Sequence, residues 1–594
     1  MAEEDRKDEP LSTFSLSALA FAVGLLAGLG ATAFRVMTGF FHNLFFLGKL
    51  SLSYDPNVHV SSNPWGVFVV LVPVLGALGV ALVQRFARET RGSGVPDTIE
   101  AVYYKQGFIR PVVSVIKPLA SALSLGSGAS VGQEGPALQI GAAVGSLASR
   151  FKKIPAWQRV LLVTAGASGG MAAVYDTPIG GMIFAMEIIL HEVSIVSLLP
   201  IAVGTATATY VARALMGPHT LFSSLLIEKT ASVVSPRDFI FYIGLGVVAG
   251  AASAGLIKGI DLSGRFFSRK VGHSHYFHHA LGMLSVGVVL YLTFVFTGHY
   301  YVASMGYATM RDVLSGALAG VPILLLFFVL KLAVTSGSLG SGASGGIFAP
   351  AMFMGATMGS AYSLALNALF PGLSLSPPSF AIAGMAAMTG GTTGAAIASL
   401  VMVFELTMDH AIIIPMAFAV AFSHAVRSML LKESFYTLTL ARRGHYVPLE
   451  MQSNFYQFER AADIMEKRFA TMPSSATVGE FVESLAEGPE TRWCLVVKSG
   501  RLEGVAGRDD VLASFLERGK EVSLGEVARR DYMSVTGETT IFDVIVTMRS
   551  RDASVAVVQD PSGRIKGIIG KEEISRTMTR SVGLSYAAEE RSVP

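Results

Sequence analysis

The chain has 594 residues, of which 51% are hydrophobic and 15% are Asp, Glu, Lys or Arg. These charged residues are unevenly spread, because 42 of the 89 lie in residues 444–594, about 28% of that region, against about 11% of residues 1–443. The lower fraction is far below the ~25% of soluble domains and excludes a soluble fold for the first 443 residues. The net charge of +3 comes without a basic face or motif that would indicate a nucleic-acid partner, and the single cysteine, Cys494, excludes an intramolecular disulfide.

Residues 1–13 are predicted to form a polar tail, and the apolar segments that follow are long enough to cross a membrane. The tail is rich in acidic residues and lacks the positive region of a secretory signal, so we expect the first apolar run to be a retained helix. Arg85, Arg88 and Arg91 follow a later run and mark a predicted cytoplasmic edge. The clearest apolar runs are residues 14–33, 66–84, 197–215, 236–257 and 411–430.

The stretch G-S-G-V-P-D, residues 92–97, contains residues that interrupt a membrane helix and free backbone amides. A new helix can start at Pro96 with Asp97 in its first turn. Taken alone, these six residues are equally consistent with an ordinary cytoplasmic turn.

A further apolar segment at residues 111–125 runs into a glycine-rich stretch at residues 124–145. This stretch recurs at residues 338–359. The first seven residues of the two copies, S-L-G-S-G-A-S, are identical. The later matches are Gly132 with Gly346, Pro136 with Pro350, Gly141 with Gly355 and Gly145 with Gly359. The chain therefore contains two related halves, about 14–216 and 236–443.

Glu134 lies in the first copy, within G-Q-E-G-P and between apolar segments. Carboxylates are costly to bury in a membrane, so a glutamate at this position is a candidate functional residue. The alternative is a loop glutamate at a water interface.

Small residues are also dense at 161–190 and 383–405, which indicates close packing of helices. Glu187 and Glu405 hold matching positions in these stretches, and we expect both to cap or tie helices rather than to contact a substrate. Tyr436 follows in E-S-F-Y-T-L-T-L-A-R-R, where a tyrosine on its own indicates an interfacial anchor.

Paired helix breaks in two related halves predict a transport site between the halves. Each break places a helix N-terminus inside the protein, where partial positive charge and free N–H groups attract an anion. The breaks G-S-G-V-P, G-Q-E-G-P and G-G-I-F-A-P contain no Lys or Arg, which favours weak anion binding suited to permeation. A cation site would need more carboxylates, and the phosphate-loop pattern, with its Lys-Ser/Thr pair, is absent from the sequence.

Four motifs together resemble the CLC family of chloride channels and transporters: residues 92–96, 132–136 and 345–350, and Tyr436 in F-Y-T-L-T-L-A-R. The resemblance spans nearly all of residues 14–443. It implies an inverted-repeat helical fold and a homodimer in which each subunit has its own pore. It also implies a gating role for Glu134. The residues that it implies for anion binding are Ser93, Gly94, Ile347, Phe348 and Tyr436.

The resemblance leaves channel and exchanger activity open. Proton-coupled members of the family carry a second glutamate just after the position that Glu187 matches, and Ile188 stands there in this chain. Ile188 cannot carry a proton, which favours a channel. However, His191 and Glu192 lie within a helical turn, and some exchangers lack that glutamate, so a chloride/proton antiporter with a different proton route is the alternative. The serine at position 93 favours chloride, with bromide or nitrate also expected to pass.

The charged tail contains two similar α/β units, residues 459–516 and 524–582, which resemble a tandem CBS pair. The remaining segments are linkers at 444–458 and 517–523 and a C-terminal tail at 583–594. CBS pairs often bind adenine nucleotides through a Ser or Thr and an acid. Here the acids are Asp510 and Glu573, but Gly507 and Gly570 replace the hydroxyl residues, which favours a structural or dimer-tightening role.

We therefore predict an all-α polytopic membrane protein with inverted repeats, followed by a cytoplasmic α/β CBS pair. It is expected to be no enzyme, to need no cofactor or metal, and to lie as a homodimer in the lipid bilayer of the cell (inner) membrane with both termini cytoplasmic. Two other functions fit the sequence less well. A ligand sensor with a membrane anchor does not explain the paired breaks, and an organic-anion transporter predicts a basic residue within a break.

Overall fold

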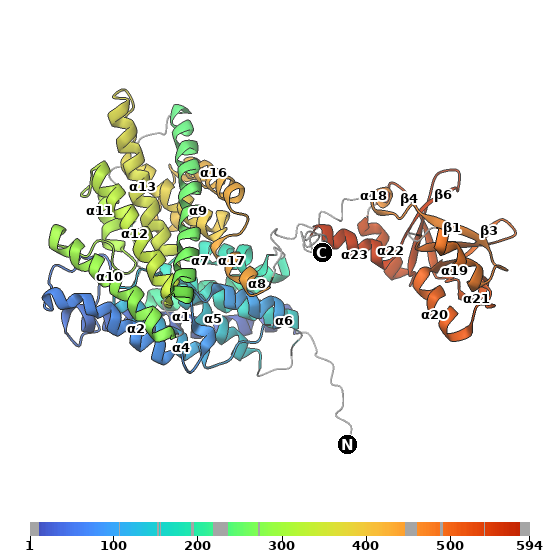
Figure 1. Cartoon of the computed structure of the whole chain (residues 1–594), viewed down its shortest axis with the longest axis horizontal. Coiled ribbons are helices and arrows are strands. Elements are labelled where there is room, and N and C mark those ends of the chain that lie inside the picture. The colour runs from blue at the N-terminus through green and yellow to red at the C-terminus, as the bar shows by residue number, and fades with distance from the viewer. Residues whose placement is uncertain are drawn as a thin grey trace, which may run out of the picture. The chain divides into compact units, whose positions relative to one another are not determined.

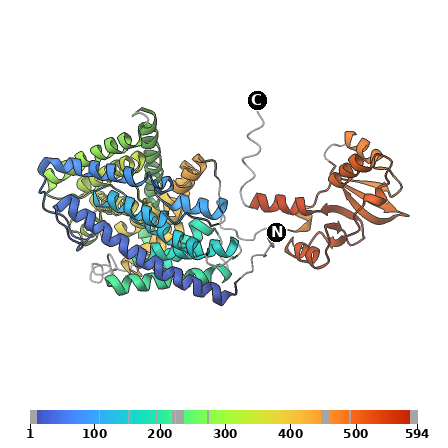
Figure 2. The ribbon, with the colours of Figure 1, turned by 90° about the horizontal axis from the view of Figure 1, so that it is seen from below.

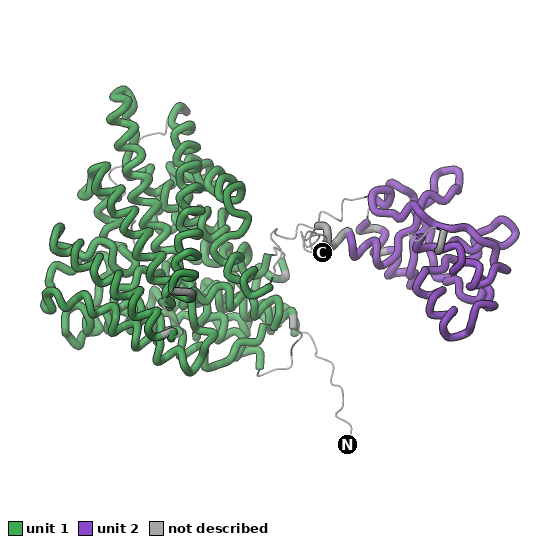
Figure 3. The backbone as a smooth tube through the Cα atoms, in the orientation of Figure 1, with its two compact units in different colours: residues 1–447 green, residues 448–594 purple. Residues whose placement is uncertain are grey.

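The structure, a computed structural model, describes residues 11–105, 107–150, 154, 156–191, 195–217, 222, 236–270, 274–445, 460–487, 491–539 and 541–581. The chain divides into two compact units, residues 1–447 and 448–594 (Figure 3). We call them the membrane unit and the tail unit and describe each by itself. The expected N-terminal tail, the linker at 444–458 and the C-terminal tail lie largely outside the described residues.

The first half of the membrane unit runs to Met216. Its elements are α1 (Thr13–His42), η1 (Asn43–Leu47), η2 (Gly66–Leu71), α2 (Val72–Val83), η3 (Arg88–Thr90), α3 (Val95–Tyr104), α4 (Val113–Gly126), α5 (Glu134–Ala148), α6 (Ala156–Tyr175), α7 (Pro178–Phe184), η4 (Ala185–Leu190) and α8 (Ile195–Met216).

The second half repeats this order and adds one helix. Its elements are η6 (Pro236–Asp238), α9 (Phe239–Lys270), α10 (His275–Thr297), α11 (Tyr307–Ser315), α12 (Val321–Ser341), α13 (Phe348–Leu369), α14 (Pro377–Thr393), α15 (Ala396–Thr407), α16 (Ile413–Leu430) and α17 (Phe435–Arg442).

Equivalent helices of the two halves pack in equivalent ways. Helix α5 packs against α6 as α13 packs against α14, and α1 packs against α8 as α9 packs against α16. In Figure 1 the blue helices of the first half run across the picture, whereas the long helices α9 and α13 of the second half stand upright. The two repeat copies meet at an antiparallel bridge between Gly132 and Gly346. The halves are therefore related repeats with equivalent helix packing, and their two glycine-rich breaks meet in antiparallel register.

The small residues of the repeats allow this close packing. A Cβ at Gly141 would lie 1.9 Å from the carbonyl oxygen of Gly166, and one at Gly166 would lie 2.1 Å from the carbonyl oxygen of Gly141. Gly355 and Gly384 have the same relation in the second half, with 2.1 and 2.2 Å. The backbones of α5 and α6, and of α13 and α14, touch directly, as the density of small residues predicts.

Seven helical segments among the described residues are long and apolar enough to cross a membrane. They are residues 13–47, 66–83, 197–216, 239–268, 276–297, 321–341 and 413–442. All five apolar runs that the sequence singles out fall within these spans or overlap them. Figure 2, which views the chain from below, shows α1 in dark blue as one of the longest of these helices.

The tail unit contains two copies of one α/β arrangement. In the first, β1 (Phe469–Pro473) pairs in parallel with β2 (Trp493–Lys498), which pairs antiparallel with β3 (Arg501–Gly507). In the second, β4 (Tyr532–Thr536), β5 (Val555–Gln559) and β6 (Ile565–Ile569) pair in the same way. The helices are α18 (Ala461–Ile464), α19 (Val478–Glu487), α20 (Arg508–Arg518), α21 (Leu524–Val527), α22 (Ile541–Ser550) and α23 (Lys571–Ser581). The turn between β2 and β3 has positive φ at Ser499 and Gly500.

Candidate anion site

Glu134 is the first residue of α5 and is fully buried. Its Oε1 accepts a hydrogen bond of 2.5 Å from the backbone N–H of Phe348 in the other half of the unit. Its Oε2 accepts a hydrogen bond of 3.1 Å from the hydroxyl of Tyr175, the last residue of α6. The alternative of a glutamate at a water interface is therefore wrong, because the carboxylate is held inside the protein.

Two glycines leave room for this carboxylate. A Cβ at Gly346 would lie 1.9 Å from Glu134 Oε1, and a Cβ at Gly132 would lie 2.0 Å from Oε2. The same two residues join the halves, because the N–H of each donates to the carbonyl of the other, at 2.8 and 2.7 Å. The antiparallel glycine bridge thus forms one wall of the carboxylate's position.

The N-terminus of α13 supplies the backbone donor to this carboxylate. Helix α13 has 22 residues, Ile347 is its N-cap and Phe348 its first residue, and both side chains are fully buried. A helix N-terminus carries about half a positive charge and free N–H groups. The Glu134 carboxylate occupies the position at which this helix end would receive a free anion.

The loop before α3 lies against both repeat copies. Gly94, the N-cap of α3, has φ of 89°, a left-handed conformation that favours glycine. A Cβ at Gly135 would lie 1.9 Å from the carbonyl oxygen of Ser93, and the N–H of Gly345 donates to the carbonyl of Gly92 at 3.3 Å. The structure therefore brings Ser93 beside the first turn of α5 and beside the break before α13. Helix α3 begins at Val95, with Asp97 in its first turn as predicted.

Tyr436 lies in the first turn of α17 and is only 1% exposed, which rules out an interfacial anchor. The ring of Phe184 joins it to the α13 end, with ring centroids 6.2 Å from Tyr436 and 6.4 Å from Phe348. Among the described residues the Tyr436 hydroxyl has no hydrogen-bond partner, although it is buried. A buried, unpaired hydroxyl is unfavourable unless another group binds it, so this oxygen is available to a bound anion.

The fold adds a cation that the break sequences lack. Lys117 of α4 is fully buried, and its Nζ donates to the backbone carbonyls of Thr90 and Gly92 at 3.1 and 2.7 Å. The sequence predicts a site with partial positive charges only, and this prediction is incomplete. Packing of α4 places the Lys117 ammonium group directly behind the break at residues 92–96.

Lys331 holds the equivalent position in α12. It is also fully buried, and its Nζ donates to the carbonyls of Val302 and Ser304 at 3.1 and 2.6 Å, ahead of α11. The two lysines are 214 residues apart, which is the repeat distance. The sequence analysis did not identify either lysine, although the two hold matching positions seven residues before the two copies of the glycine-rich stretch.

Glu187 and Glu405 act as the predicted structural ties. Glu187 accepts hydrogen bonds from the N–H groups of Ile397 and Ala398 at 3.2 and 2.8 Å, at the start of α15. Glu405 accepts hydrogen bonds from the N–H groups of Ile179 and Gly180 at 3.0 and 2.7 Å, at the start of α7. Each glutamate caps a helix of the opposite half.

Ile188, the residue after Glu187, is buried in the π-helical turn η4. His191 ends this segment with φ of 50°, and its Nδ1 lies 3.3 Å from the Tyr103 hydroxyl. Glu192, the other ionisable residue considered as part of a proton route, lies outside the described residues.

The two acids considered for nucleotide binding are engaged with protein groups. Asp510 binds Arg529 through two hydrogen bonds of 2.8 and 2.6 Å. Glu573 accepts hydrogen bonds from the Trp493 indole at 3.3 Å and from the N–H of Gly570 at 2.8 Å. A Cβ at Gly570 would lie 2.4 Å from the Trp493 ring, so the ring occupies the space that a hydroxyl side chain would need.

Comparison with known proteins agrees with this arrangement. The family model described as voltage gated chloride channel matches residues 75–428, and the CBS domain model matches residues 461–517 and 524–580. A protein of Ralstonia nicotianae (strain ATCC BAA-1114 / GMI1000), named putative chloride channel protein ClcB-like, is 30% identical over 384 residues, which are 64% of this chain and 86% of that protein. The voltage-gated ClC-type chloride channel ClcB of Escherichia coli O127:H6 (strain E2348/69 / EPEC) is 29% identical over 439 residues, 72% of this chain and 99% of that protein.

Two solved structures share the fold. The crystal structure of a slow cyanobacterial Cl⁻/H⁺ antiporter superimposes with a TM-score of 0.63 at 22% identity, covering 73% of this chain and 99% of that one. The structure of a eukaryotic CLC transporter does so with a TM-score of 0.59 at 19% identity, covering 94% of this chain and 98% of that one.

Proposed function

The chain belongs to the voltage gated chloride channel family, the CLC family, and from that premise we propose that it conducts chloride through a pore gated by Glu134. In this proposal Ser93 and Tyr436 offer hydroxyls to the anion, while the backbone around Gly94 and the amides of Ile347 and Phe348 offer partial positive charge. The membrane domain extends over residues 14–443, and the CBS-like units over 459–516 and 524–582.

The observation that carries the proposal is the position of the Glu134 carboxylate. It accepts the hydrogen bond of the Phe348 amide, which is the group that would bind a permeating anion. A carboxylate held by donors built for an anion blocks the site while it is ionised. Protonation removes its charge and weakens these hydrogen bonds, so the side chain leaves and chloride passes.

The aliphatic side chain of Ile188 supports passive conduction, because it offers no proton-carrying group next to Glu187. The alternative is a chloride/proton antiporter with a different proton route, and the fold shared with a Cl⁻/H⁺ antiporter gives this alternative a specific basis. The two versions differ in whether chloride flux moves protons.

The test uses the purified full-length chain in liposomes, with chloride and pH recorded in the same experiment. The Glu134→Gln and Glu134→Ala variants are expected to fold normally and to lose most of the pH dependence of chloride flux. A passive channel should move chloride without stoichiometric proton movement. Uphill proton transport driven by a chloride gradient would establish the antiporter instead.

Glu405→Gln is a matched control, because Glu405 is another glutamate of the membrane unit whose carboxylate accepts hydrogen bonds from backbone N–H groups. It lies in α15 and binds the start of α7, away from Phe348. This variant should leave the pH profile unchanged. If the Glu134 variants keep the parent's pH profile, Glu134 is not the gate. If the parent shows no anion flux at all, the sensor hypothesis regains support.

We further propose that the protein forms a homodimer in the cell (inner) membrane, with both termini and the CBS pair in the cytoplasm. The CBS pair is assigned a structural, dimer-tightening role rather than nucleotide binding. The occupied space at Gly570 and the contacts of Asp510 and Glu573 favour this assignment.

A further inference from the structure

The Glu134 carboxylate is connected to hydroxyl groups that lead away from the anion-binding groups. Tyr175 donates to Glu134 Oε2 at 3.1 Å, and the Tyr175 hydroxyl interacts in turn with the hydroxyl of Tyr307. The side-chain amide of Gln133 donates to the Tyr307 hydroxyl at 3.1 Å. Both tyrosines are about 1% exposed, so these polar groups form an internal chain.

The Tyr307 end of this hydrogen-bonded chain lies at a cavity, which we call the Arg35 pocket. Its lining includes Arg35, Tyr54, Gln133, Met305 and Tyr307, and its volume is about 50 Å³. A water molecule needs roughly 10–15 Å³ and polar partners, so the pocket can hold water at the Tyr307 end.

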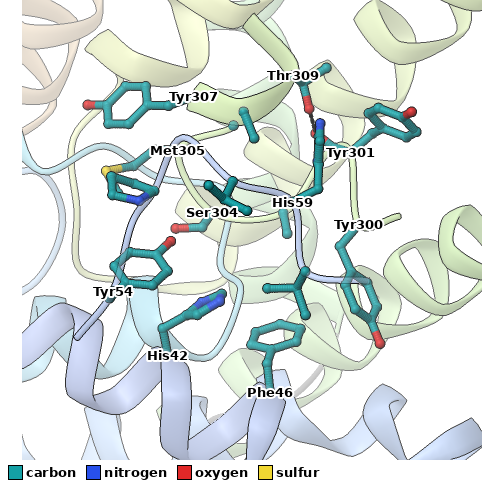
Figure 4. Close-up of a pocket in the computed structure, with 16 residues that line it drawn as sticks. His42, Phe46, Tyr54, His59, Tyr300, Tyr301, Ser304, Met305, Tyr307 and Thr309 are labelled. Atoms are coloured by element: carbon teal, nitrogen blue, oxygen red, sulfur yellow. Dashed lines mark hydrogen bonds between the residues drawn. The ribbon is translucent and has the colours of Figure 1, made fainter. Parts of the chain in front are cut away.

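A neighbouring cavity shares Tyr54, Met305 and Tyr307 with the Arg35 pocket. Its lining also includes His42, His59 and Tyr300. Figure 4 shows Tyr307 at its edge, with the hydroxyl directed away from His59. Tyr307 therefore borders both cavities, and its hydroxyl belongs to the hydrogen-bonded chain that leads to Glu134.

We propose that Tyr175 and Tyr307 form a proton relay that joins the Glu134 carboxylate to water in the Arg35 pocket. The inference rests on the proposed role of Glu134 as the gate. It gives the gate a route for protons that is separate from the path of the anion, which passes Ser93 and Tyr436.

The relay conserves protons at every step. A hydronium ion in the pocket gives its proton to Tyr307 Oη, Tyr307 passes its own proton to Tyr175 Oη, and Tyr175 passes its own to Glu134 Oε2. One water remains in the pocket, one neutral carboxyl forms, and both tyrosines end neutral. Rotation of the two hydroxyls resets the chain, and the reverse sequence returns the proton.

Several other charged or titratable groups face the hydrogen-bonded chain between Glu134 and the Arg35 pocket. Tyr436 faces Glu134 from α17. Arg35 faces Tyr307 from α1, and Asp176, which is paired with Arg213, lies next to Tyr175 in sequence. Tyr54 borders the pocket, and Asp55 faces Arg35. Lys331 lies behind the loop that leads to Tyr307. Tyr175 and Tyr307 are the groups whose hydroxyls connect the carboxylate to the pocket.

The test measures how fast chloride flux responds to a pH jump imposed on each side of the liposome membrane in turn. Tyr307→Phe keeps the hydrogen bond between Tyr175 and Glu134 and removes the Tyr307 hydroxyl, together with its hydrogen bond from Gln133. We expect its response to slow by about tenfold or more for a jump on the side that the pocket serves, since a positioned proton donor contributes at least that much. Its steady-state pH midpoint should stay close to that of the parent.

Tyr175→Phe provides a second variant. It should slow the response equally and also shift the midpoint to higher pH, because the ionised carboxylate loses a donor. Tyr300→Phe is the control, since the Tyr300 hydroxyl is buried without a hydrogen-bond partner among the described residues. Thermal unfolding and flux at a fixed pH confirm that each variant is folded.

The relay is overturned if Tyr307→Phe and Tyr175→Phe respond as fast as Tyr300→Phe on both sides. If Glu134→Gln removes the pH dependence while the tyrosine variants respond like the parent, the gate stands and only the relay fails. If Glu134→Gln keeps the pH dependence, the gate assignment fails and the relay fails with it.

Discussion

Glu134 occupies its position because two glycines leave the space empty. The Gly346 Cα faces the carboxylate closely enough that an added Cβ would lie 1.9 Å from Oε1 and 2.3 Å from Cδ. The group that would be displaced is the end of a flexible side chain, which can move more easily than the backbone bridge between Gly132 and Gly346. A methyl group at this position should therefore act on the carboxylate rather than on the fold.

We predict that Gly346→Ala raises chloride flux near neutral pH and removes most of its pH dependence, as if the gate were held open. Flux from liposomes across a pH series measures this effect. Gly372→Ala is the control, because a Cβ there would meet open space. In the Glu134→Ala background the added methyl should change nothing further, and an undiminished effect in that background would show that it acts elsewhere.

Individual site residues differ in how far the sequence alone reveals them. Glu134 stands out because a carboxylate within an apolar, glycine-rich stretch is unusual, and its burial was predictable for that reason. Tyr175 was missed, since its partner is 41 residues away and nothing in Y-D-T-P indicates a contact. Lys117 was missed for a similar reason, because the carbonyls that bind it lie 25 and 27 residues earlier in the chain.

The helix ends of one half are completed by side chains of the other half. Glu405 in α15 caps α7, and Glu187 in η4 caps α15, so each short helix has two of its first N–H groups satisfied from across the unit. The matching positions of the glutamates in the two copies were visible in the sequence. Their reciprocal targets were not, because they depend on how the halves face each other.

We predict that Glu405→Ala lowers the stability of the membrane unit by about 1–3 kcal/mol, the cost of leaving buried backbone donors unpaired. Thermal unfolding of the protein in detergent measures the change. Glu405→Gln keeps one acceptor oxygen and should lose less. Chloride flux per folded molecule should be largely retained in both, and a complete loss of flux without a loss of stability would assign Glu405 to the pore instead.

At the scale of the whole molecule, the contrast in charge between residues 1–443 and 444–594 predicts two different environments, and the structure divides into compact units at residue 447. The internal repeats were predictable because their glycines and prolines recur at fixed spacing. The inverted relation of the halves came from the family resemblance rather than from the residues, since no local pattern records the direction in which a repeat is inserted.

Cys494 reports on the tail unit alone, because it is the only cysteine in the chain and lies in β2. Its side chain is fully buried, and burial raises the pKa of the thiol to about 12 because the thiolate is poorly solvated. The thiolate is the reactive form, and an unfolded cysteine has a pKa near 8.5. Folding therefore suppresses alkylation, and the stability of the tail unit should decline as pH rises from about 8.5 towards 12.

We predict that the native protein is alkylated slowly by iodoacetamide, with little acceleration between pH 7 and 9, and that unfolding the tail unit restores rapid, pH-dependent labelling. Mass spectrometry across a urea series measures the modified fraction, while chloride flux follows the membrane unit in parallel. If the two units unfold independently, labelling should appear at a urea concentration that differs from the one that abolishes flux. Cys494→Ser gives the unlabelled baseline, and rapid labelling of the native protein at pH 8 would contradict the buried position of the thiol.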